Sequence, residues 1–113
     1  MRCGLMAQMA DLAAQLLGAA RSLDPAFHIS SGCRTRKEQR ELYARFLAGR
    51  NALPVAPPGR SLHEIGLAVD VSRGRDPYSD RLLTLLGRWW VQAGLGWSPR
   101  DPVHFQLPFI GRA

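Results

Sequence analysis

The sequence predicts a single domain of the α+β class. With 113 residues, the chain is long enough for one domain, covering 1–113, and too short for two. Apolar residues make up 46% of the chain and charged residues 21%, which excludes disordered, collagen-like and coiled-coil proteins. Stretches with helical periodicity alternate with short stretches in which every second residue is apolar. This alternation predicts helices and strands in the order α-β-α-β-α-β.

The first half of the chain is expected to form a helix, a strand and a second helix. Apolar residues recur at helical spacing over 4–22, and an Asp-Pro pair follows. The stretch 27–34 alternates between apolar and polar residues and predicts a strand. A Thr-x-x-Glu capping box opens the second helix, over 35–48. The apolar stripe of this helix comprises Leu42, Tyr43, Phe46 and Leu47.

The second half is expected to add a loop, two strands and a third helix. Four of the chain's turn-forming residues lie in 50–62, which predicts a surface loop. The strand 66–72 follows, and a polar turn over 73–78 leads to a helix with a wide apolar face over 82–93. The last strand is expected over 103–107, with His104 and Gln106 facing away from the core.

The chain is basic, with 15 lysines and arginines against nine acidic residues and a formal net charge of +6. Such a protein concentrates near polyanions, which include nucleic acid, anionic lipid and an acidic cell wall. The arginines are scattered over every segment and no nucleic-acid motif is present, so no nucleic-acid partner is expected. No apolar run approaches the ~20 residues of a membrane span. Polar residues interrupt the N-terminal apolar stretch, so no secretory signal is expected.

The two cysteines, Cys3 and Cys33, form neither a disulfide framework nor a four-thiolate zinc site. Each is interpreted as a small apolar residue, and Cys33 is expected to be buried on the strand that carries it. His28 is expected to be an exposed strand residue.

Asp70 is a carboxylate in the middle of an apolar strand, and burying it without a partner would be costly. Its strand face otherwise holds only Gly66 and Ala68. His63 precedes the strand, and His104 lies on the last strand. Two imidazoles and one carboxylate are a common zinc ligand set that leaves a fourth position open. Taken singly, however, each of these residues is also compatible with an ordinary structural role.

Asp101 lies three residues before His104, with a proline between them that favours extended backbone. A carboxylate there could reach a water molecule beside the metal and act as a general base. The same residue is also compatible with a simple turn.

Three segments together resemble a known family. Residues 61–70 read SLHEIGLAVD, residues 101–105 read DPVHF, and residues 31–39 read SGCRTRKEQ. They resemble the motifs S-x-H-x-x-G-x-A-x-D, D-x-x-H and S-G-Y-R-[ST]-x-x-E-Q of the zinc D-Ala-D-Ala carboxypeptidases and L-Ala-D-Glu endopeptidases, peptidase family M15. The motifs occur in the family's order and lie within 30–106. Cys33 stands where the family has an aromatic residue.

The resemblance implies roles for individual residues. His63, Asp70 and His104 would be the ligands of Zn²⁺, and Asp101 would be the general base. Arg34 would stabilise the oxyanion. Ser61 would contact substrate or support the site. Gln39 would support Arg34.

The resemblance also implies a fold and an activity. The helices would pack on one face of a small, mostly antiparallel sheet, as in hedgehog-type and DD-peptidase domains, with the zinc site on the opposite, open face. The protein would be a monomeric peptidase for the stem peptide of bacterial peptidoglycan, first of all an endolysin-like L-Ala-D-Glu endopeptidase, made in the cytoplasm and released to the wall during phage or prophage lysis. The alternatives are a D-Ala-D-Ala carboxypeptidase and a non-catalytic zinc-containing module that binds the wall.

Overall fold

The computed structural model describes residues 4–51 and 53–107. Its main elements follow the predicted order α-β-α-β-α-β, and two short 3-10 helices are added. The elements are α1 (Ala7–Leu23), β1 (His28–Ser31), α2 (Arg36–Leu47), η1 (Leu62–Ile65), β2 (Ala68–Ser72), η2 (Pro77–Ser79), α3 (Arg81–Gln92) and β3 (His104–Gln106).

The three strands form one small sheet in the order β1-β2-β3, and both neighbouring pairs are antiparallel. The central strand β2 therefore contacts both others. In its register, Asp70 lies opposite His104 of β3 on one side and Ser31 of β1 on the other. The predicted fold class, an α+β domain with a small antiparallel sheet, is confirmed.

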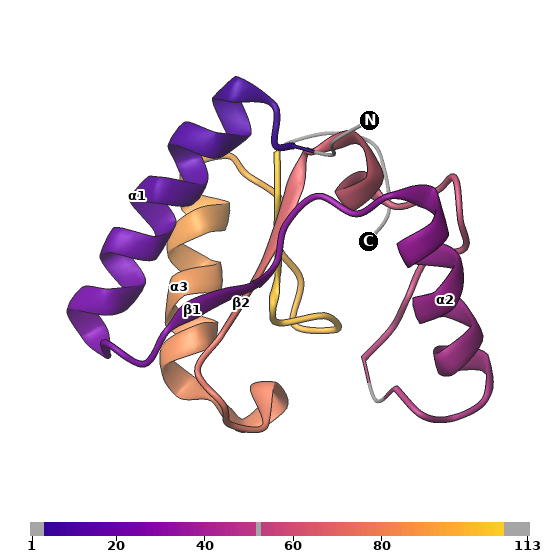
Figure 1. Cartoon of the computed structure of the whole chain (residues 1–113). Helices are drawn as coiled ribbons and strands as arrows, with labels where there is room; N and C mark the ends of the chain where they lie inside the picture. Colours follow the sequence, from indigo (N-terminus) through magenta and orange to yellow (C-terminus); the bar gives the residue numbers. More distant parts are fainter. Residues whose placement is uncertain (1–3, 52, 108–113) are drawn as a thin grey trace.

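The helices lie on different sides of the sheet (Figure 1). α1 and α3 lie side by side and cover one face, which holds the apolar core. Alternate residues of β2 and β3 point into this core, as the two-residue alternation predicts, and Asp70 and His104 are left on the other face. The largest fully buried apolar side chains are Trp90, Phe27, Phe105, Met9, Leu16, Leu83, Val69 and Val71.

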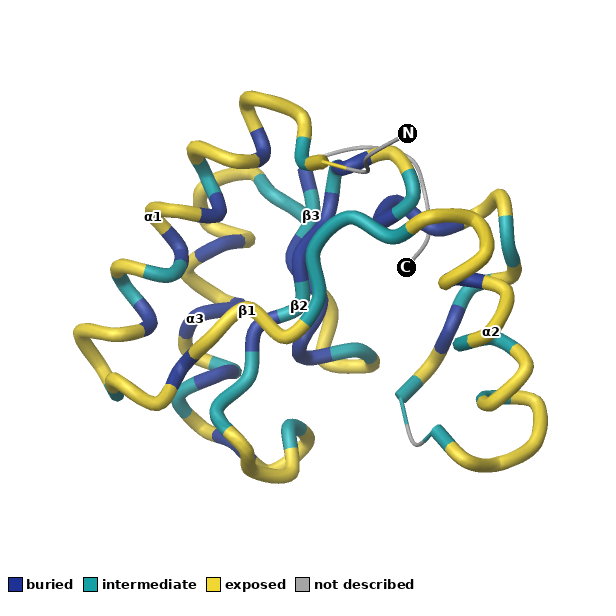
Figure 2. The backbone as a smooth tube through the Cα atoms, viewed as in Figure 1, coloured by how far each residue is buried: buried dark blue, intermediate teal, exposed yellow. Residues whose placement is uncertain are grey.

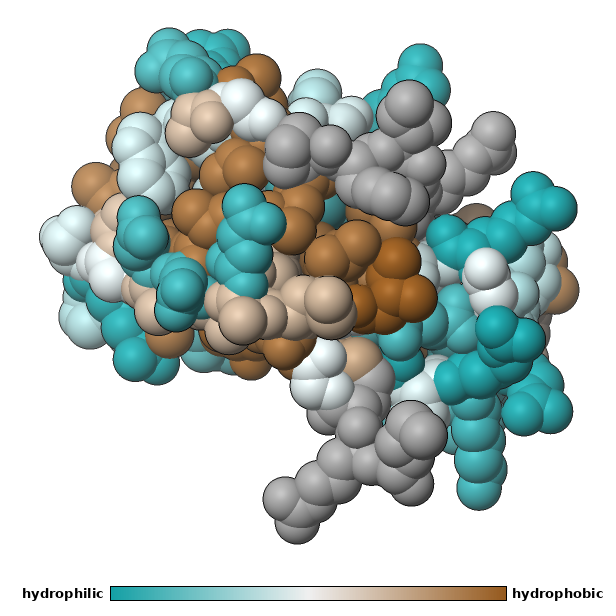
Figure 3. Space-filling model, turned by 90° about the horizontal axis from the view of Figure 1, so that it is seen from above, coloured by the Kyte–Doolittle hydropathy of each residue, from teal (hydrophilic) through white to brown (hydrophobic). Residues whose placement is uncertain are grey.

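α2 stands apart from this core, on the opposite side of the sheet (Figure 1). The predicted capping box of Thr35 and Glu38 is present and begins the helix. The apolar stripe of α2 is only half-buried, and Leu47 is 67% exposed. Gln39 is instead the only buried residue of this helix. Figure 3 shows hydrophilic side chains gathered over this part of the molecule, and apolar ones over the body formed by α1, α3 and the sheet.

Two local predictions need correction. The strand expected over 27–34 has only four residues, and a bulge between Ile29 and Ser31 shifts its pairing with β2. Ile29 lies opposite the core residue Val71 but on an outer strand of the sheet, and it is 37% exposed, while Phe27, just before the strand, is fully buried. The loop expected over 50–62 is not entirely a surface loop, because Val55 is buried. Figure 2 shows buried stretches along the chain that follows α2.

Cys33 is disulfide-bonded and half-buried, and not the buried, unpaired thiol that the sequence suggested. Disulfide pairing depends on tertiary placement, which residue spacing does not reveal. Cys3, the other cysteine of the chain, lies outside the described residues. Among the residues that the structure describes, no helix has both the length and the apolar character that crossing a membrane requires.

Arg73 joins the ends of three elements at the end of the molecule away from η1. Its guanidinium donates two hydrogen bonds to Asp80, of 2.8 and 2.9 Å, and one of 2.7 Å to Asp24. Asp80 also caps α3 by accepting from the backbone N–H groups of Leu82 and Leu83. The pKa of Asp24 is held below its ordinary value first by the Ala26 N–H and then by Arg73, and that of Asp80 is lowered mainly by Arg73. The two carboxylates in turn raise the pKa of Arg73.

Candidate metal centre

Three potential metal ligands meet on the face of the sheet that lies away from α1 and α3. The antiparallel register places Asp70 of β2 directly beside His104 of β3, and η1 brings His63 over the same point. One ligand atom from each of these residues lies within 4.8 Å of the others. His63 Nε2 is 3.0 Å from Asp70 Oδ1 and 3.1 Å from His104 Nδ1, and His104 Nδ1 is 3.5 Å from Asp70 Oδ1.

The short helix η1 fixes the backbone of His63. Ser61 and Glu64 form a second capping box, in which the Ser61 hydroxyl accepts a hydrogen bond from the His63 N–H. Gly66 ends the helix in the left-handed conformation, at φ +73°. A Cβ atom at this position would also collide with the backbone of Gly4. The glycine of the motif is therefore required both by its backbone conformation and by the lack of space for a side chain.

Both histidines donate a hydrogen bond from the ring nitrogen that faces away from the common point. His63 Nδ1 donates to the carbonyl oxygen of Gly32 at 2.8 Å, and His104 Nε2 donates to Gln106 Oε1 at 2.7 Å. Because both partners are oxygen acceptors, these nitrogens carry the protons. The other nitrogens, His63 Nε2 and His104 Nδ1, therefore present lone pairs to the common point, as metal-ligating histidines do.

Asp70 supplies a third lone-pair atom to the same point. Its Oδ1 is buried and has no hydrogen-bond partner among the described residues, although two imidazole nitrogens lie close to it. Three acceptor atoms facing one another in a buried place are the arrangement that a cation stabilises. The residues present therefore fit a zinc ion, which takes nitrogen and carboxylate ligands and keeps an open position in catalytic sites.

The carboxyl group of Asp70 stays ionised in this setting. Burial alone would raise its pKa, but the close contacts with His104 and His63 and the charge of Arg34 hold the pKa well below its usual range. For His104, burial acts to lower the pKa, yet its contact with Asp70 outweighs burial and the pKa is raised. A proton therefore competes with a cation at His104, so metal binding weakens at acid pH.

Arg34 lies beside the three ligands and is held at three points. Its guanidinium donates to Ser31 Oγ at 2.9 Å, to Gln39 Oε1 at 3.1 Å and to Asp70 Oδ2 at 2.9 Å. Gln39 in turn donates to the carbonyl oxygen of Ala56 at 2.7 Å. Gln39 thus joins α2, Arg34 and the loop after α2, a contact that agrees with the supporting role expected of it.

Asp101 lines the same pocket but does not belong to the group of three ligands. Burial of its carboxyl group and the nearby charge of Asp70 raise its pKa to about 6. The short loop that carries Asp101 is tied down on both sides: the Tyr78 hydroxyl donates to the Arg100 carbonyl oxygen at 2.9 Å, and Trp97 Nε1 donates to the Pro102 carbonyl oxygen at 2.8 Å. A carboxyl group that titrates near neutrality suits a general base.

The wall of the pocket comes partly from residues that sequence reasoning missed. Arg34, His63, Asp70, Asp101 and His104 are joined there by Leu42, Asn51, Leu53, Pro54 and Val55. The apolar residues in 51–55 were a signal in the sequence that this loop packs against the rest of the domain. Ser61, expected to contact substrate or to support the site, caps η1 by accepting from the His63 N–H, and it is not among the residues that line the pocket. His28 is exposed, as expected.

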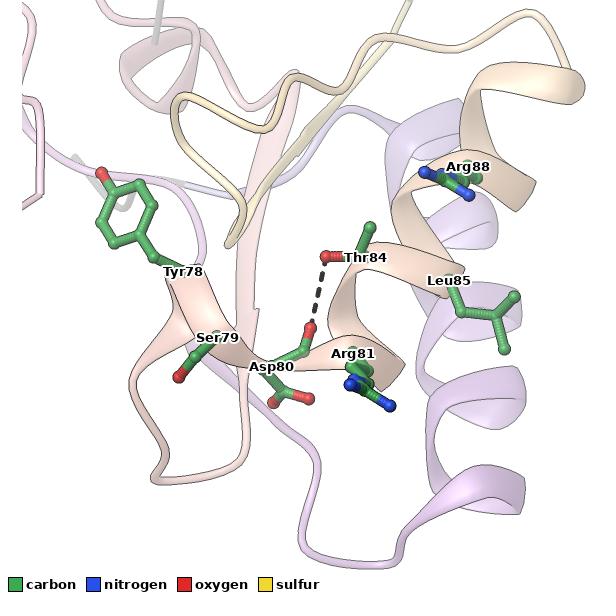
Figure 4. Close-up of a pocket in the computed structure, with 7 residues that line it drawn as sticks. All are labelled: Tyr78, Ser79, Asp80, Arg81, Thr84, Leu85 and Arg88. Atoms are coloured by element: carbon green, nitrogen blue, oxygen red, sulfur yellow. Dashed lines mark hydrogen bonds between the residues drawn. The ribbon is translucent and has the colours of Figure 1, made fainter.

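A second hollow lies on the outer side of α3 and η2, away from the ligands (Figure 4). Arg81 and Arg88 project from one side of α3, while the Thr84 hydroxyl donates to the Asp80 carbonyl oxygen. The only carboxyl group in this hollow, that of Asp80, is already bound by Arg73. The hollow therefore offers no set of metal ligands.

The fold is shared with three structures of enzymes that act on D-amino-acid peptides. A vancomycin-resistance D,D-dipeptidase, VanXYg, solved with a D-Ala-D-Ala phosphinate analogue, matches with a TM-score of 0.71 and 19% identity over 94% of this chain. The chain spans only 51% of that protein. A zinc complex of the D,D-pentapeptidase VanY matches with a TM-score of 0.67 and 22% identity, over 94% of this chain and 74% of the other. The LD-carboxypeptidase LdcB matches with a TM-score of 0.66 and 22% identity, over 96% and 66%.

With identities of 19–22%, these matches show a shared fold and nothing more. The assignment of the chain to a family rests on a separate match in sequence. No curated protein matches the chain in sequence. Residues 2–93, however, match the family model described as VanY, D-alanyl-D-alanine carboxypeptidase. The match includes Arg34, His63 and Asp70 and ends before Asp101 and His104, which the antiparallel pairing of β3 with β2 brings to the same site. The chain therefore belongs to the VanY family of D-alanyl-D-alanine carboxypeptidases, within the wider peptidase family whose motifs it carries.

Proposed function

We propose that this chain is a zinc-dependent peptidase that hydrolyses the stem peptide of bacterial peptidoglycan. The observation that carries the proposal is the convergence of three lone-pair atoms, from His63, Asp70 and His104, on one buried point. Asp101 and Arg34 line the same pocket. A set of ligands, a carboxyl group near neutrality and a fixed cation are together the parts that peptide hydrolysis requires.

His63 Nε2, Asp70 Oδ1 and His104 Nδ1 would hold the zinc ion. When bound there, zinc supplies Lewis acidity and lowers the pKa of water to about 7. Asp101, with a pKa of about 6, is ionised at neutral pH and takes the proton of the attacking water. After attack, Asp101 returns this proton to the nitrogen of the leaving amine.

Arg34 stabilises the negative oxygen that develops on the cleaved carbonyl group. Its guanidinium is permanently charged and is already oriented by Ser31 and Gln39, so little reorganisation accompanies the reaction. Removing one such donor typically costs about 10²–10³ in rate. The presence of both Arg34 and Asp101 favours an enzyme over a module that only binds the wall.

Two bonds in the stem peptide are candidates. Membership of the VanY family favours the terminal D-Ala-D-Ala bond. The loop between Trp97 and Asp101 has only three residues, so little chain borders the pocket on that side, and such an open site favours an internal bond such as L-Ala-D-Glu. We place the carboxypeptidase first and keep the endopeptidase as the second candidate.

Mass spectrometry of purified peptidoglycan treated with the zinc-loaded chain tests both. Loss of terminal D-Ala supports the carboxypeptidase, and new N-terminal D-Glu ends support the endopeptidase. Either product must disappear in a control treated with chelator and return when zinc is restored. Absence of cleavage on walls of several chemical types, with zinc measured in the protein, would contradict the proposal and favour the binding module.

A further inference from the structure

A groove runs beside the metal centre, between β1 and α2. Its lining includes Ser30 and Gly32 from the β1 side and Glu38 and Arg45 from α2. Two further residues, Arg34 and Leu42, line both this groove and the pocket that holds the three ligands. The groove is therefore continuous with the candidate active site at the residue expected to hold the cleaved carbonyl oxygen.

One wall of this groove is a sheet edge. β1 is the outer strand of the sheet and pairs only with β2 among the described residues. The outer edge of a strand presents main-chain N–H and C=O groups that can bind an extended peptide. The groove is lined on this side by the four consecutive residues 30–33, of which Ser30 and Ser31 belong to β1. Four residues of extended chain span about 13 Å.

The opposite wall carries an arginine that has no side-chain partner among the described residues. Arg45 is exposed, and it makes no ion pair or side-chain hydrogen bond with any described residue. The other arginine of the groove, Arg34, is held by three hydrogen bonds. Arg45 is thus the cation in the groove that is available to a ligand.

The acidic residue of the groove does not neutralise Arg45. Glu38 accepts a hydrogen bond from the Thr35 N–H, which keeps its carboxylate at the beginning of α2 and lowers its pKa. Arg45 lies seven residues later on the same helix, about 10 Å further along its axis. The two charges therefore belong to different ends of the groove.

We propose that this groove binds the part of an extended peptide on the N-terminal side of the cleaved bond, and that Arg45 pairs with a carboxylate on that part. This inference rests on the proposed function, which places the cleaved bond at Arg34. A carboxypeptidase releases only the end of its substrate, so the longer, retained part needs a site several residues long. The wall formed by residues 30–33 has that length, and the guanidinium of Arg45 selects an anionic side group.

Binding of two product peptides tests the proposal without requiring cleavage. The peptides are identical except that one carries a free carboxylate and the other a carboxamide, two residues before the C-terminus. Their dissociation constants are measured by calorimetry on the zinc-loaded wild-type chain, on Arg45→Gln and on Arg40→Gln. Arg40 is the matched control, because it is an exposed arginine on the same helix that does not line the groove.

The wild-type chain is expected to bind the carboxylate peptide about two- to fivefold more tightly, the range of an exposed ion pair. Arg45→Gln should abolish this preference and leave the affinity for the carboxamide peptide unchanged. Arg40→Gln should keep the preference. Equal binding of the two peptides by the wild type, or a preference that survives in Arg45→Gln, would overturn the proposal.

The two proposals fail in different ways. A carboxylate preference that depends on Arg45, in a chain that cleaves no peptidoglycan, would refute the proposed function and support the groove. Cleavage of peptidoglycan without any Arg45-dependent preference would support the function and refute the groove.

Discussion

The two sides of the sheet are stabilised in different ways. Between the sheet and the pair α1 and α3, fully buried side chains such as Leu16, Leu83 and Trp90 form a dry apolar core. On the other side, α2, η1 and the intervening loop are held mainly by hydrogen bonds, among them two capping boxes and the link from Gln39 to Ala56. The apolar side gives the fold its stability, and the polar side gives the site its geometry. Substitutions on the two sides should therefore change different measurable quantities.

The largest effect is expected for His63→Ala, on the polar side. The substitution removes one of three ligand atoms, so the zinc affinity should fall by more than the 10–100-fold that is typical of losing an outer-shell partner. Zinc content after gel filtration, measured by elemental analysis, should drop from about one ion per chain to near zero, with activity lost. Retention of one ion per chain would contradict the assignment of this ligand.

Asp101→Asn should separate chemistry from metal binding. Asp101 lines the pocket but is not one of the three ligands, so zinc content and thermal stability should stay near the wild-type values. The turnover number should fall by about 10²–10⁴, the usual contribution of a general base. If turnover stays within a few-fold of the wild type, another group is the base.

Two leucines compare the sides directly. Leu16 of α1 is fully buried in the core, and Leu47 of α2 is 67% exposed. Leu16→Ala should lower the free energy of unfolding by about 2–5 kcal/mol, measured with chemical denaturant. Leu47→Ala should change it by less than about 0.5 kcal/mol, as surface substitutions do. Similar losses for both would show that α2 belongs to the same packed unit as α1.

The pH dependence of kcat/KM reports on Asp101. Burial and the charge of Asp70 raise its pKa to about 6, and only the ionised form accepts a proton. Activity should therefore be complete above this pH and fall about tenfold per unit below it. A bound cation lowers the pKa of Asp101 below this value, so the midpoint of the fall in kcat/KM lies at or below pH 6. The assay needs excess zinc, and Asp101→Asn should lack this acid limb.

Gln39→Leu should lower activity less than the substitutions at His63 and Asp101, because it removes a partner of Arg34 and leaves Arg34 itself. The Arg34 guanidinium loses one of its three acceptors, and the Ala56 carbonyl loses its donor. A hydrogen bond to a charged group contributes about 1.5 kcal/mol, which corresponds to a loss of about tenfold in kcat/KM. Zinc content should stay unchanged. A loss of zinc would mean that Gln39 supports the ligands and not only Arg34.

The contrast between the sides also explains which features could be predicted from sequence. Periodicity located α1, α3 and the central strand well, because apolar side chains facing a core are what creates such patterns. The half-buried stripe of α2 looked like another core face, since periodicity shows which side of a helix is apolar but not what covers it. The exposure of Ile29 was not predicted, because alternation shows which face of a strand is apolar but not whether the strand lies at the edge of the sheet.

For the site, sequence showed which residue types are available, and the structure shows how they are oriented. The motifs indicated the three potential ligands, Arg34 and Asp101 as candidate site residues. The acceptors that fix the ring protons, Gly32 and Gln106, were not found, because a carbonyl group leaves no mark in a sequence and Gln106 looked like an ordinary strand residue. The capping role of Ser61 was likewise hidden behind its place in the motif.

The ion pair between Arg34 and Asp70 has a consequence for the order in which the site is filled. In the pocket, the carboxylates of Asp70 and Asp101 face the Arg34 guanidinium, and the raised pKa of His104 lets that ring carry a proton as well. A divalent cation would take the place of the proton on His104 and add positive charge to the pocket. The pocket with a cation would therefore attract an acidic peptide more strongly than the pocket without one. Metal binding would in this way come first and favour the binding of an anionic substrate.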